Sequence, residues 1–110
     1  MSLEDHTETD KPDHEVAKSA LRRTLLSECL GKENAMSGKA LAEKTPVSSS
    51  TIRDLIGELR REEGIPVYSL GQGYFVISTS DEFKECVARI DQEIATRQET
   101  KRELYNATIQ

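Results

Sequence analysis

The chain has 110 residues, of which 35% are hydrophobic and 32% are charged, and its net charge is −5. This length supports one small hydrophobic core and excludes two independent domains. The excess of acid does not favour a nucleic-acid partner, because phosphate binding depends on Lys and Arg. No apolar run approaches the length of a membrane span, so we expect no membrane partner. The two cysteines are expected to be reduced thiols, which fits a cytoplasmic protein.

The charge is unevenly distributed along the chain. Residues 1–15 contain six acidic residues and one basic residue, whereas residues 16–80 contain nine basic and seven acidic residues. Residues 81–110 contain five basic and seven acidic residues. The middle segment is therefore the only net-positive one, which permits contact with DNA without establishing it.

The first part of the chain divides at about residue 12. Residues 1–12 are polar and acidic, and such a segment buries too little apolar area to offset the entropy of ordering. We expect a disordered acidic tail there. A helix is predicted from Asp13 to about Leu30, ended by Gly31, because apolar residues recur at helical spacing. These residues are Val16, Ala20, Leu21, Leu25 and Cys29.

Two further helices follow. Ser37 can cap a short helix that runs through Lys44. Ser48 can cap a third helix, and Gly64 occupies the position at which a left-handed closing residue is favoured. One face of the third helix is aliphatic, with Ile52, Leu55, Ile56 and Leu59.

A β-hairpin is predicted after Pro66. Residues 67–70 and 74–77 are rich in β-branched and aromatic side chains and flank the sequence Gly71-Gln72-Gly73. Ala35 and Met36 can form a minimal additional strand. Residues 13–79 are therefore expected to form one domain.

The last segment, residues 80–110, is expected to be one long helix, with Ser80 as a candidate cap, because no Gly or Pro interrupts it. From residue 81 to 108 such a helix is about 40 Å long. Alternating steps of four and three residues define a heptad seam, which can pack on its own domain or join two chains. Two basic seam residues argue against a long parallel coil. We expect the amino half of the helix to pack on the domain and some of the rest to pair with a second chain as a homodimer, antiparallel or only partly coiled. After Phe83 the predicted dimerisation residues are Val87, Ile90, Ile94, Arg97, Lys101 and Leu104.

Residues 41–56, LAEKTPVSSSTIRDLI, resemble the helix-turn-helix of winged-helix DNA-binding proteins. They are especially similar to the amino-terminal domain of biotin-operon repressors and to small prokaryotic and viral regulators. Residues 64–76, GIPVYSLGQGYFV, are similar to that family's second strand, wing and third strand. The resemblance implies an α+β fold, a winged helix-turn-helix of three helices and a β-hairpin wing, here with a long C-terminal helix. Pro46 replaces the usual turn glycine, so the turn is expected to be longer or differently bent.

The resemblance implies that the third helix reads the major groove of double-stranded DNA. Ser49, Ser50 and Arg53 are the best candidates for groove contact, since they lie opposite the aliphatic face. Further candidates for base, phosphate or minor-groove contact are Thr51, Gly57, Lys39, Lys44, Arg60, Arg61 and Gln72. Arg53 can instead form an ion pair with an acid on the same helix, and for Arg60 and Arg61 such pairs are as well supported as contact with phosphate.

These observations predict a homodimeric transcriptional regulator of a prokaryote or its virus. The alternatives are a protein–protein interaction module that uses the winged helix as a scaffold, and a replication or plasmid-maintenance factor. No catalytic constellation of side chains is recognisable, so we expect no enzyme activity and no cofactor. Cys29 and Cys86 match no metal-ligand spacing, so we expect reduced thiols and no metal site.

Overall fold

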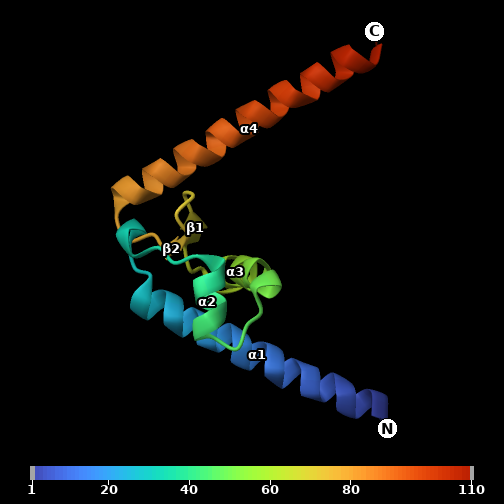
Figure 1. Cartoon of the computed structure of the whole chain (residues 1–110), viewed down its shortest axis with the longest axis vertical. Helices are drawn as coiled ribbons and strands as arrows, with labels where there is room; N and C mark the ends of the chain where they lie inside the picture. Colours follow the sequence, from blue (N-terminus) through green and yellow to red (C-terminus); the bar gives the residue numbers. More distant parts are fainter. Residues whose placement is uncertain (1, 110) are drawn as a thin grey trace. The chain divides into compact units, whose positions relative to one another are not determined.

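The computed structural model describes the backbone of residues 2–109 and the side chains of residues 13–108. The chain divides into two compact units, Met1–Ser78 and Thr79–Gln110, which are considered separately here. The elements, in chain order, are α1 (Ser2–Glu28), the 3₁₀ helix η1 (Lys32–Asn34), α2 (Gly38–Lys44), α3 (Ser49–Glu63), β1 (Val67–Ser69), β2 (Tyr74–Val76) and α4 (Ser80–Ile109) (Figure 1).

Helix α1 has different bounds from those expected. It is assigned from Ser2 rather than from near Asp13, and it ends at Glu28, two residues before the predicted end. The predicted tail, residues 1–12, lies outside the residues whose side chains are described, so its disorder stays a prediction. Gly31 follows the helix with a φ of 86°, a left-handed conformation that favours glycine.

Helices α2 and α3 begin and end where local signals predict. The Ser37 hydroxyl accepts a hydrogen bond from the amide of Ala40 at 3.1 Å, as a capping residue does. Gly64 closes α3 with a φ of 68°. The four residues between the helices are within the usual length of a helix-turn-helix connection. The effect of Pro46 is therefore on the bend of the connection, since Thr45 before it is extended (φ −133°, ψ 159°).

Strands β1 and β2 form the predicted antiparallel hairpin. Val67 pairs with Val76 and Ser69 with Tyr74, so each strand has three residues, one fewer than expected. The expected strand at Ala35 and Met36 is present as one isolated bridge between Met36 and Tyr74. Both backbone hydrogen bonds of this bridge form, at 3.0 and 2.8 Å.

The core of the first unit joins α1, α2 and α3 to the hairpin. Helix α1 contributes Leu21, Leu25 and Cys29, which are 0% exposed. The predicted aliphatic face of α3 is buried, as are Leu41, Val47, Val67 and Val76 in the same cluster. Burying one large aliphatic or aromatic side chain stabilises a fold by about 1.5–3 kcal/mol. Val16, expected on the apolar face of the first helix, is instead 61% exposed.

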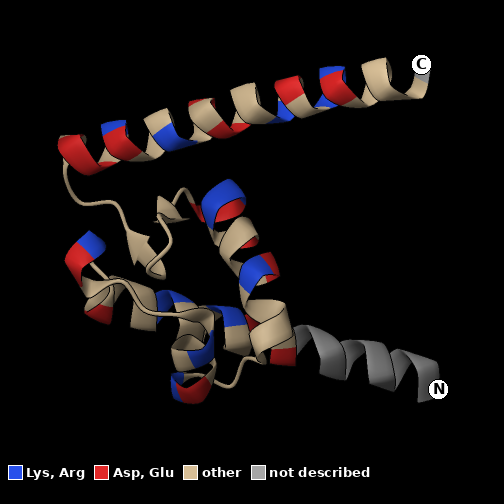
Figure 2. Cartoon of the chain, turned by 45° about the horizontal axis from the view of Figure 1, so that its top comes forward, with Lys and Arg blue, Asp and Glu red and all other residues tan. Residues whose placement is uncertain are grey.

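The second unit consists of α4 alone. Its 30 residues correspond to about 45 Å of helix. Thr79, not Ser80, caps it, because the Thr79 hydroxyl accepts a hydrogen bond from the amide of Glu82 at 3.1 Å. Acidic and basic residues both occur along the helix (Figure 2). The three helices and hairpin followed by this long helix confirm the predicted α+β winged helix-turn-helix class.

Within the described part of the chain, the search for a helix long and apolar enough to cross a membrane finds none. Cys29 and Cys86 are both free thiols and both buried.

Candidate nucleic-acid interface

Helix α3 packs on α2 and α1 and leaves its first turn at the surface of the first unit. Ile52 and Leu55 are each 1% exposed and anchor one side of α3 in the core. Ser49 and Arg53 lie on the other side, one helical turn apart, and both are exposed. Burial of the aliphatic face therefore directs the polar amino end of α3 outwards.

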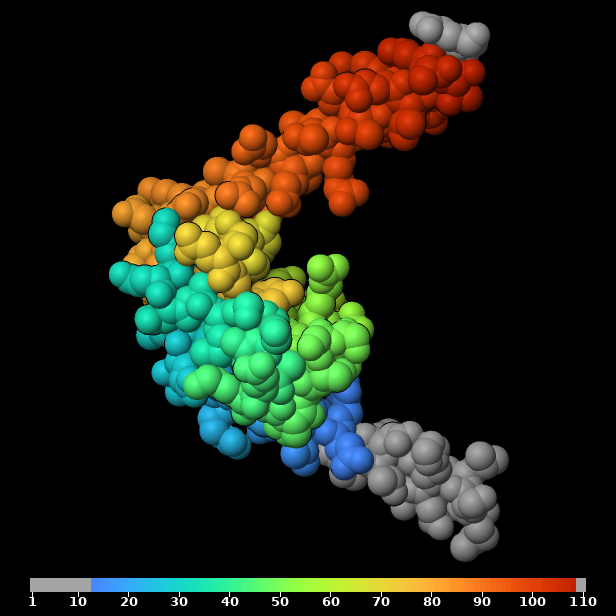
Figure 3. Space-filling view, viewed as in Figure 1, coloured from blue at the N-terminus to red at the C-terminus, as the bar shows by residue number. Residues whose placement is uncertain are grey.

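A hollow in the surface adjoins this first turn. It is formed by the starts of α2 and α3 and by β2, and its lining residues are Gly38, Ser49, Ser50, Ile52, Arg53, Asp54 and Tyr74. In Figure 3, α2 and the start of α3, coloured teal to green, form a continuous part of the surface of this unit. The three residues predicted to contact the groove thus line one site.

The hydroxyl groups at the start of α3 contact one another. The Ser48 hydroxyl lies 3.2 Å from that of Ser50 and 2.8 Å from that of Thr51. Ser48 occupies the predicted N-cap position, but its side chain makes no capping hydrogen bond. The first amides of a helix have no intrahelical acceptor, so this helix end can donate to an anion.

Arg53 and Asp54 place opposite charges on the hollow. Arg53 is exposed, and no ion pair with it is present among the residues that the structure describes. Asp54 lines the same hollow and repels phosphate. A duplex seated here must therefore approach Arg53 and the serines while keeping its phosphates away from Asp54.

Residues 22–75 match a family described as an HTH (helix-turn-helix) domain, which includes amino-terminal domains like that of the biotin-operon repressor. The chain contains a helix-turn-helix domain of this family. The matched segment begins in α1, covers α2, α3 and β1, and ends in β2. The predicted resemblance is therefore confirmed, and α3 is the second helix of the motif. No curated protein and no solved structure matches the chain.

The basic residues around the helix-turn-helix motif differ in their surroundings. Lys39 is exposed at the start of α2. Lys44 pairs with Glu28 at 2.9 Å, and this hydrogen bond raises the Lys44 pKa. Arg60 donates two hydrogen bonds to the Val67 carbonyl. Among the residues that the structure describes, Lys44 and Arg60 have internal partners, whereas no ion pair with Lys39 is present.

The remaining candidates do not line the hollow. A Cβ atom on Gly57 would be 3.0 Å from a guanidinium nitrogen of Arg61, so the Arg61 side chain lies over Gly57. Thr51 is half-buried, and its hydroxyl contacts Ser48. Gln72 is exposed at the hairpin tip. The roles of all these residues in DNA binding stay predictions.

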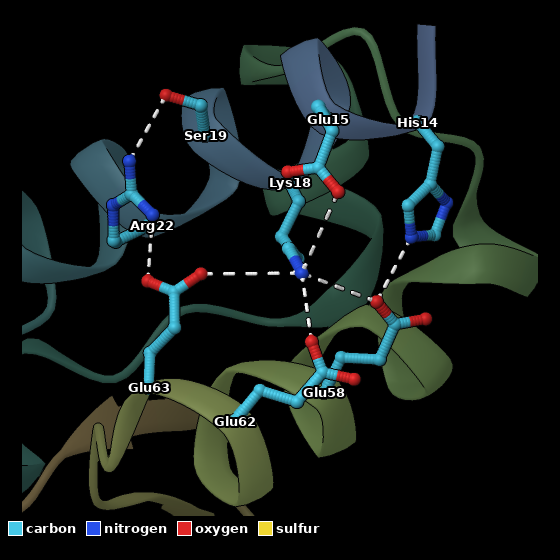
Figure 4. A network of polar contacts seen from close by, with 8 residues as sticks. All are labelled: His14, Glu15, Lys18, Ser19, Arg22, Glu58, Glu62 and Glu63. Atoms are coloured by element: carbon cyan, nitrogen blue, oxygen red, sulfur yellow. Dashed lines mark hydrogen bonds and ion pairs between the residues drawn. The ribbon is translucent and has the colours of Figure 1, made fainter. Parts of the chain in front are cut away.

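A network of charged residues connects α1 to the second half of α3 (Figure 4). Lys18 is only 6% exposed, and its ammonium lies 3.0 Å from Glu62 and 3.5 Å from Glu58. The network also contains a hydrogen bond of 2.8 Å from His14 to Glu58 and one of 2.6 Å from Arg22 to Glu63. These contacts hold α3 against α1.

The pKa values in the network follow from these contacts. The hydrogen bond with Glu62 is the main cause of a raised Lys18 pKa, although desolvation acts in the opposite direction. The hydrogen bond from His14 is the main cause of a lowered Glu58 pKa, with Lys18 adding to it. Both shifts favour the charged forms.

Sequence reasoning missed two contributions to the helix-turn-helix domain. Tyr74 reaches the hollow because its backbone pairs with Met36, a contact between residues 38 positions apart. Lys18 is buried because three acids of α3 and Glu15 surround it. The acids at positions 58, 62 and 63, spaced along the far end of α3, were the available signal for a buried cation on another helix.

Proposed function

We propose that this protein binds double-stranded DNA by placing the first turn of α3 in the major groove. The observation that carries the proposal is the hollow at the amino end of α3, where Ser49, Ser50 and Arg53 are exposed together. In a helix-turn-helix, the amino-terminal residues of the second helix contact base edges. The family assignment and this geometry both support contact with DNA through this face of α3.

The side chains on this face have complementary roles in the proposal. Arg53 pairs with the O6 and N7 atoms of a guanine, for which its planar fork of donors is suited. Ser49 and Ser50 donate to bases or phosphates, and Lys39 at the start of α2 neutralises a phosphate. Gln72 at the tip of the hairpin approaches the adjacent minor groove. Only the arginine contact in this set discriminates strongly between base pairs.

We further propose that the protein is a homodimeric transcriptional regulator in the cytoplasm and not an enzyme. The exposed apolar residues of α4, among them Ile94 and Leu104, support a contact between two chains. In such a dimer, the α3 helices of the two chains would contact half-sites about 34 Å apart, or a multiple of that distance.

One observation favours a second candidate function. The chain has a net charge of −5, and residues 65–78, which include the hairpin, contain no Lys or Arg. A winged helix with so little positive charge can serve as a scaffold for protein–protein contacts. A replication or plasmid-maintenance factor would share the DNA chemistry of the regulator.

A titration of the full chain against a fluorescent pool of random-sequence duplexes tests the proposal. DNA binding predicts an affinity that falls steeply between about 50 and 200 mM salt, because condensed counterions are released when Lys and Arg neutralise phosphates. Absence of binding at low salt would refute DNA binding and leave the scaffold function. Selection of bound duplexes over several rounds then yields the preferred site for tests of single residues.

A further inference from the structure

Helix α4 presents a long apolar face to solvent. Its exposed apolar residues, 38–64% accessible, are Phe83, Val87, Ile90, Ile94, Leu104 and Tyr105. Except for Tyr105, they occupy heptad seam positions together with Arg97 and Lys101. An apolar seam of this length is typical of a helix that packs against another helix.

The two halves of α4 have net charges of opposite sign, although each half contains both acidic and basic residues. Residues 80–94 contain five acidic and two basic residues, whereas residues 95–109 contain three basic and two acidic residues. In residues 80–94 all four seam residues are apolar, and the acidic residues lie outside the seam. The basic half includes the two basic seam residues, Arg97 and Lys101.

This distribution makes the orientation of a paired helix matter. In a parallel pair, Arg97 and Lys101 of one chain face the same two residues of the other chain, and the acidic halves also lie together. Like charges at such close range are unfavourable. In an antiparallel pair the acidic half of each helix lies along the basic half of the other.

A specific antiparallel register also fits the surface of α4. A shallow hollow on the helix is lined by Arg97, Thr100, Lys101, Leu104, Tyr105 and Thr108. These residues form two successive four-residue holes of the kind that receive one side chain each in helix packing. In the register that places Val87 of one chain opposite Leu104 of the other, Ile90 lies opposite Lys101. Val87 and Ile90 then enter the two holes.

The basic seam residues are accommodated in this register. Ile94 lies opposite Arg97, and Ile90 lies opposite Lys101, so the aliphatic stems of the basic side chains cover apolar surface. The charged head of Lys101 extends towards Asp91, which follows Ile90 in the sequence. The same residues that oppose a parallel pair therefore stabilise an antiparallel one.

We propose that α4 of a second copy of this chain covers this face, in antiparallel orientation and with Val87 opposite Leu104. This inference rests on the dimeric part of the proposed function and specifies how the two chains meet. It is independent of whether α3 binds DNA, so the tests below contain no DNA.

Disulfide cross-linking tests the orientation. Two full-length variants, Val87→Cys and Leu104→Cys, are made in a background carrying Cys29→Ala and Cys86→Ala, and one of them carries a mass tag. After mixing, exchange and mild oxidation, the antiparallel register predicts a covalent dimer that contains one chain of each kind. Each variant oxidised alone then yields no covalent dimer. Covalent dimers from each variant alone would indicate a parallel pair and overturn the proposal.

Sedimentation of the unmodified full chain provides a second measurement that does not depend on the cysteine variants. A monomer at all concentrations overturns both the dimer and this pairing. The unmodified chain can instead be a dimer while the two cysteine variants form no mixed covalent product. If circular dichroism shows that both variants are folded, this result overturns the register alone.

A charge-neutralising variant distinguishes the two orientations by the sign of its effect. Arg97→Gln/Lys101→Gln weakens an antiparallel dimer, by roughly tenfold in the dissociation constant, because charge complementarity is lost. The same variant tightens a parallel dimer by removing repulsion, and that result would overturn the proposal. Arg89→Gln/Arg102→Gln is the matched control, since it removes the same charge away from the seam and is expected to change the dissociation constant less.

Discussion

The Arg60 guanidinium donates two hydrogen bonds to the backbone carbonyl of Val67, at 3.1 Å from Nε and 2.9 Å from one terminal nitrogen. This contact joins the end of α3 to the first residue of β1. A side chain held in this way serves the fold, whereas the sequence alone left its role open between phosphate contact and an intrahelical ion pair. Arg61, one residue later, lies over Gly57 and makes no such contact with the hairpin.

Arg60→Ala is therefore expected to lower the free energy of unfolding by about 1–2 kcal/mol, because hydrogen bonds from a charged donor are lost. Chemical denaturation of the full chain measures this change. Arg61→Ala is the control and is expected to change stability by less than about 0.5 kcal/mol. Equal effects of the two substitutions would contradict a specific role for Arg60.

Gly73 is expected to be the least replaceable residue of the hairpin. Its φ is 128°, and an added Cβ atom would lie 2.6 Å from the carbonyl carbon of Met36, which belongs to the backbone and cannot move aside. Gly73→Ala should destabilise the protein by more than about 2 kcal/mol. Gly71→Ala provides a matched control, since Gly71 has a φ of 108° but no atom within 4 Å of an added Cβ.

The two alanine variants separate backbone strain from steric overlap. Gly71→Ala introduces strain alone and is expected to cost about 1 kcal/mol. Thermal unfolding followed by circular dichroism compares them directly. A cost for Gly73→Ala no greater than that for Gly71→Ala would show that the approach to Met36 is not a constraint.

The charged network predicts a loss of stability in acid. Hydrogen bonding from His14, reinforced by Lys18, lowers the Glu58 pKa below its ordinary value of 4.5 in the folded state. A group whose pKa is lowered by folding stabilises the fold above its unfolded pKa, and this stabilisation is lost as the pH falls through the folded pKa. The free energy of unfolding should therefore decrease as the pH is lowered below about 4.5.

Glu58→Gln removes this titration while keeping the shape of the side chain. The variant is expected to be less stable than the parent at about pH 7. Its stability should also depend less on pH between about pH 5 and pH 3, on either side of the ordinary glutamate pKa. Glu33→Gln, in η1, is the control. Parallel stability profiles for the parent and Glu58→Gln would argue against a coupling between Glu58 and folding.

Arg53 is expected to dominate sequence discrimination if α3 reads the major groove. Arg53→Ala should weaken binding to the selected duplex by about 1–3 kcal/mol and relax the preference at one base pair. Fluorescence anisotropy with the selected site and with each single-base variant measures both effects. Arg23→Ala, an exposed substitution on α1 with the same change in charge, should leave the base preference intact. An unchanged affinity for Arg53→Ala would remove Arg53 from the proposed contact set.

Local signals in the sequence were sufficient for most elements of the fold. The cap at Ser37, the glycine exit at Gly64 and the aliphatic face of α3 depend on residues within one or two helical turns of each other. The hairpin was similarly marked by β-rich runs around two glycines. Such signals were less reliable at boundaries, where Thr79 rather than Ser80 accepts the capping hydrogen bond.

The parts that could not be predicted depend on residues far apart in the sequence. Lys18 is buried although lysine is rarely found inside a protein, because α3 supplies three carboxylates to it. Val16 lies two residues before Lys18, so it is on the opposite side of α1 from the buried lysine and is exposed. Likewise, the sequence predicted Ser49, Ser50 and Arg53 from a local pattern, but Tyr74 joins them only through the pairing of β2 with Met36.

The pairing of Tyr74 with Met36 also has a mechanical consequence. Met36 directly precedes the residue that caps α2, while Tyr74 lines the hollow at the start of α3. The hairpin and both helices of the motif are therefore braced into one stiff body. In a complex of the proposed kind, the adjustment needed for a close fit falls on the duplex, so sequences that bend or twist at low cost would be favoured even at base pairs that no side chain touches.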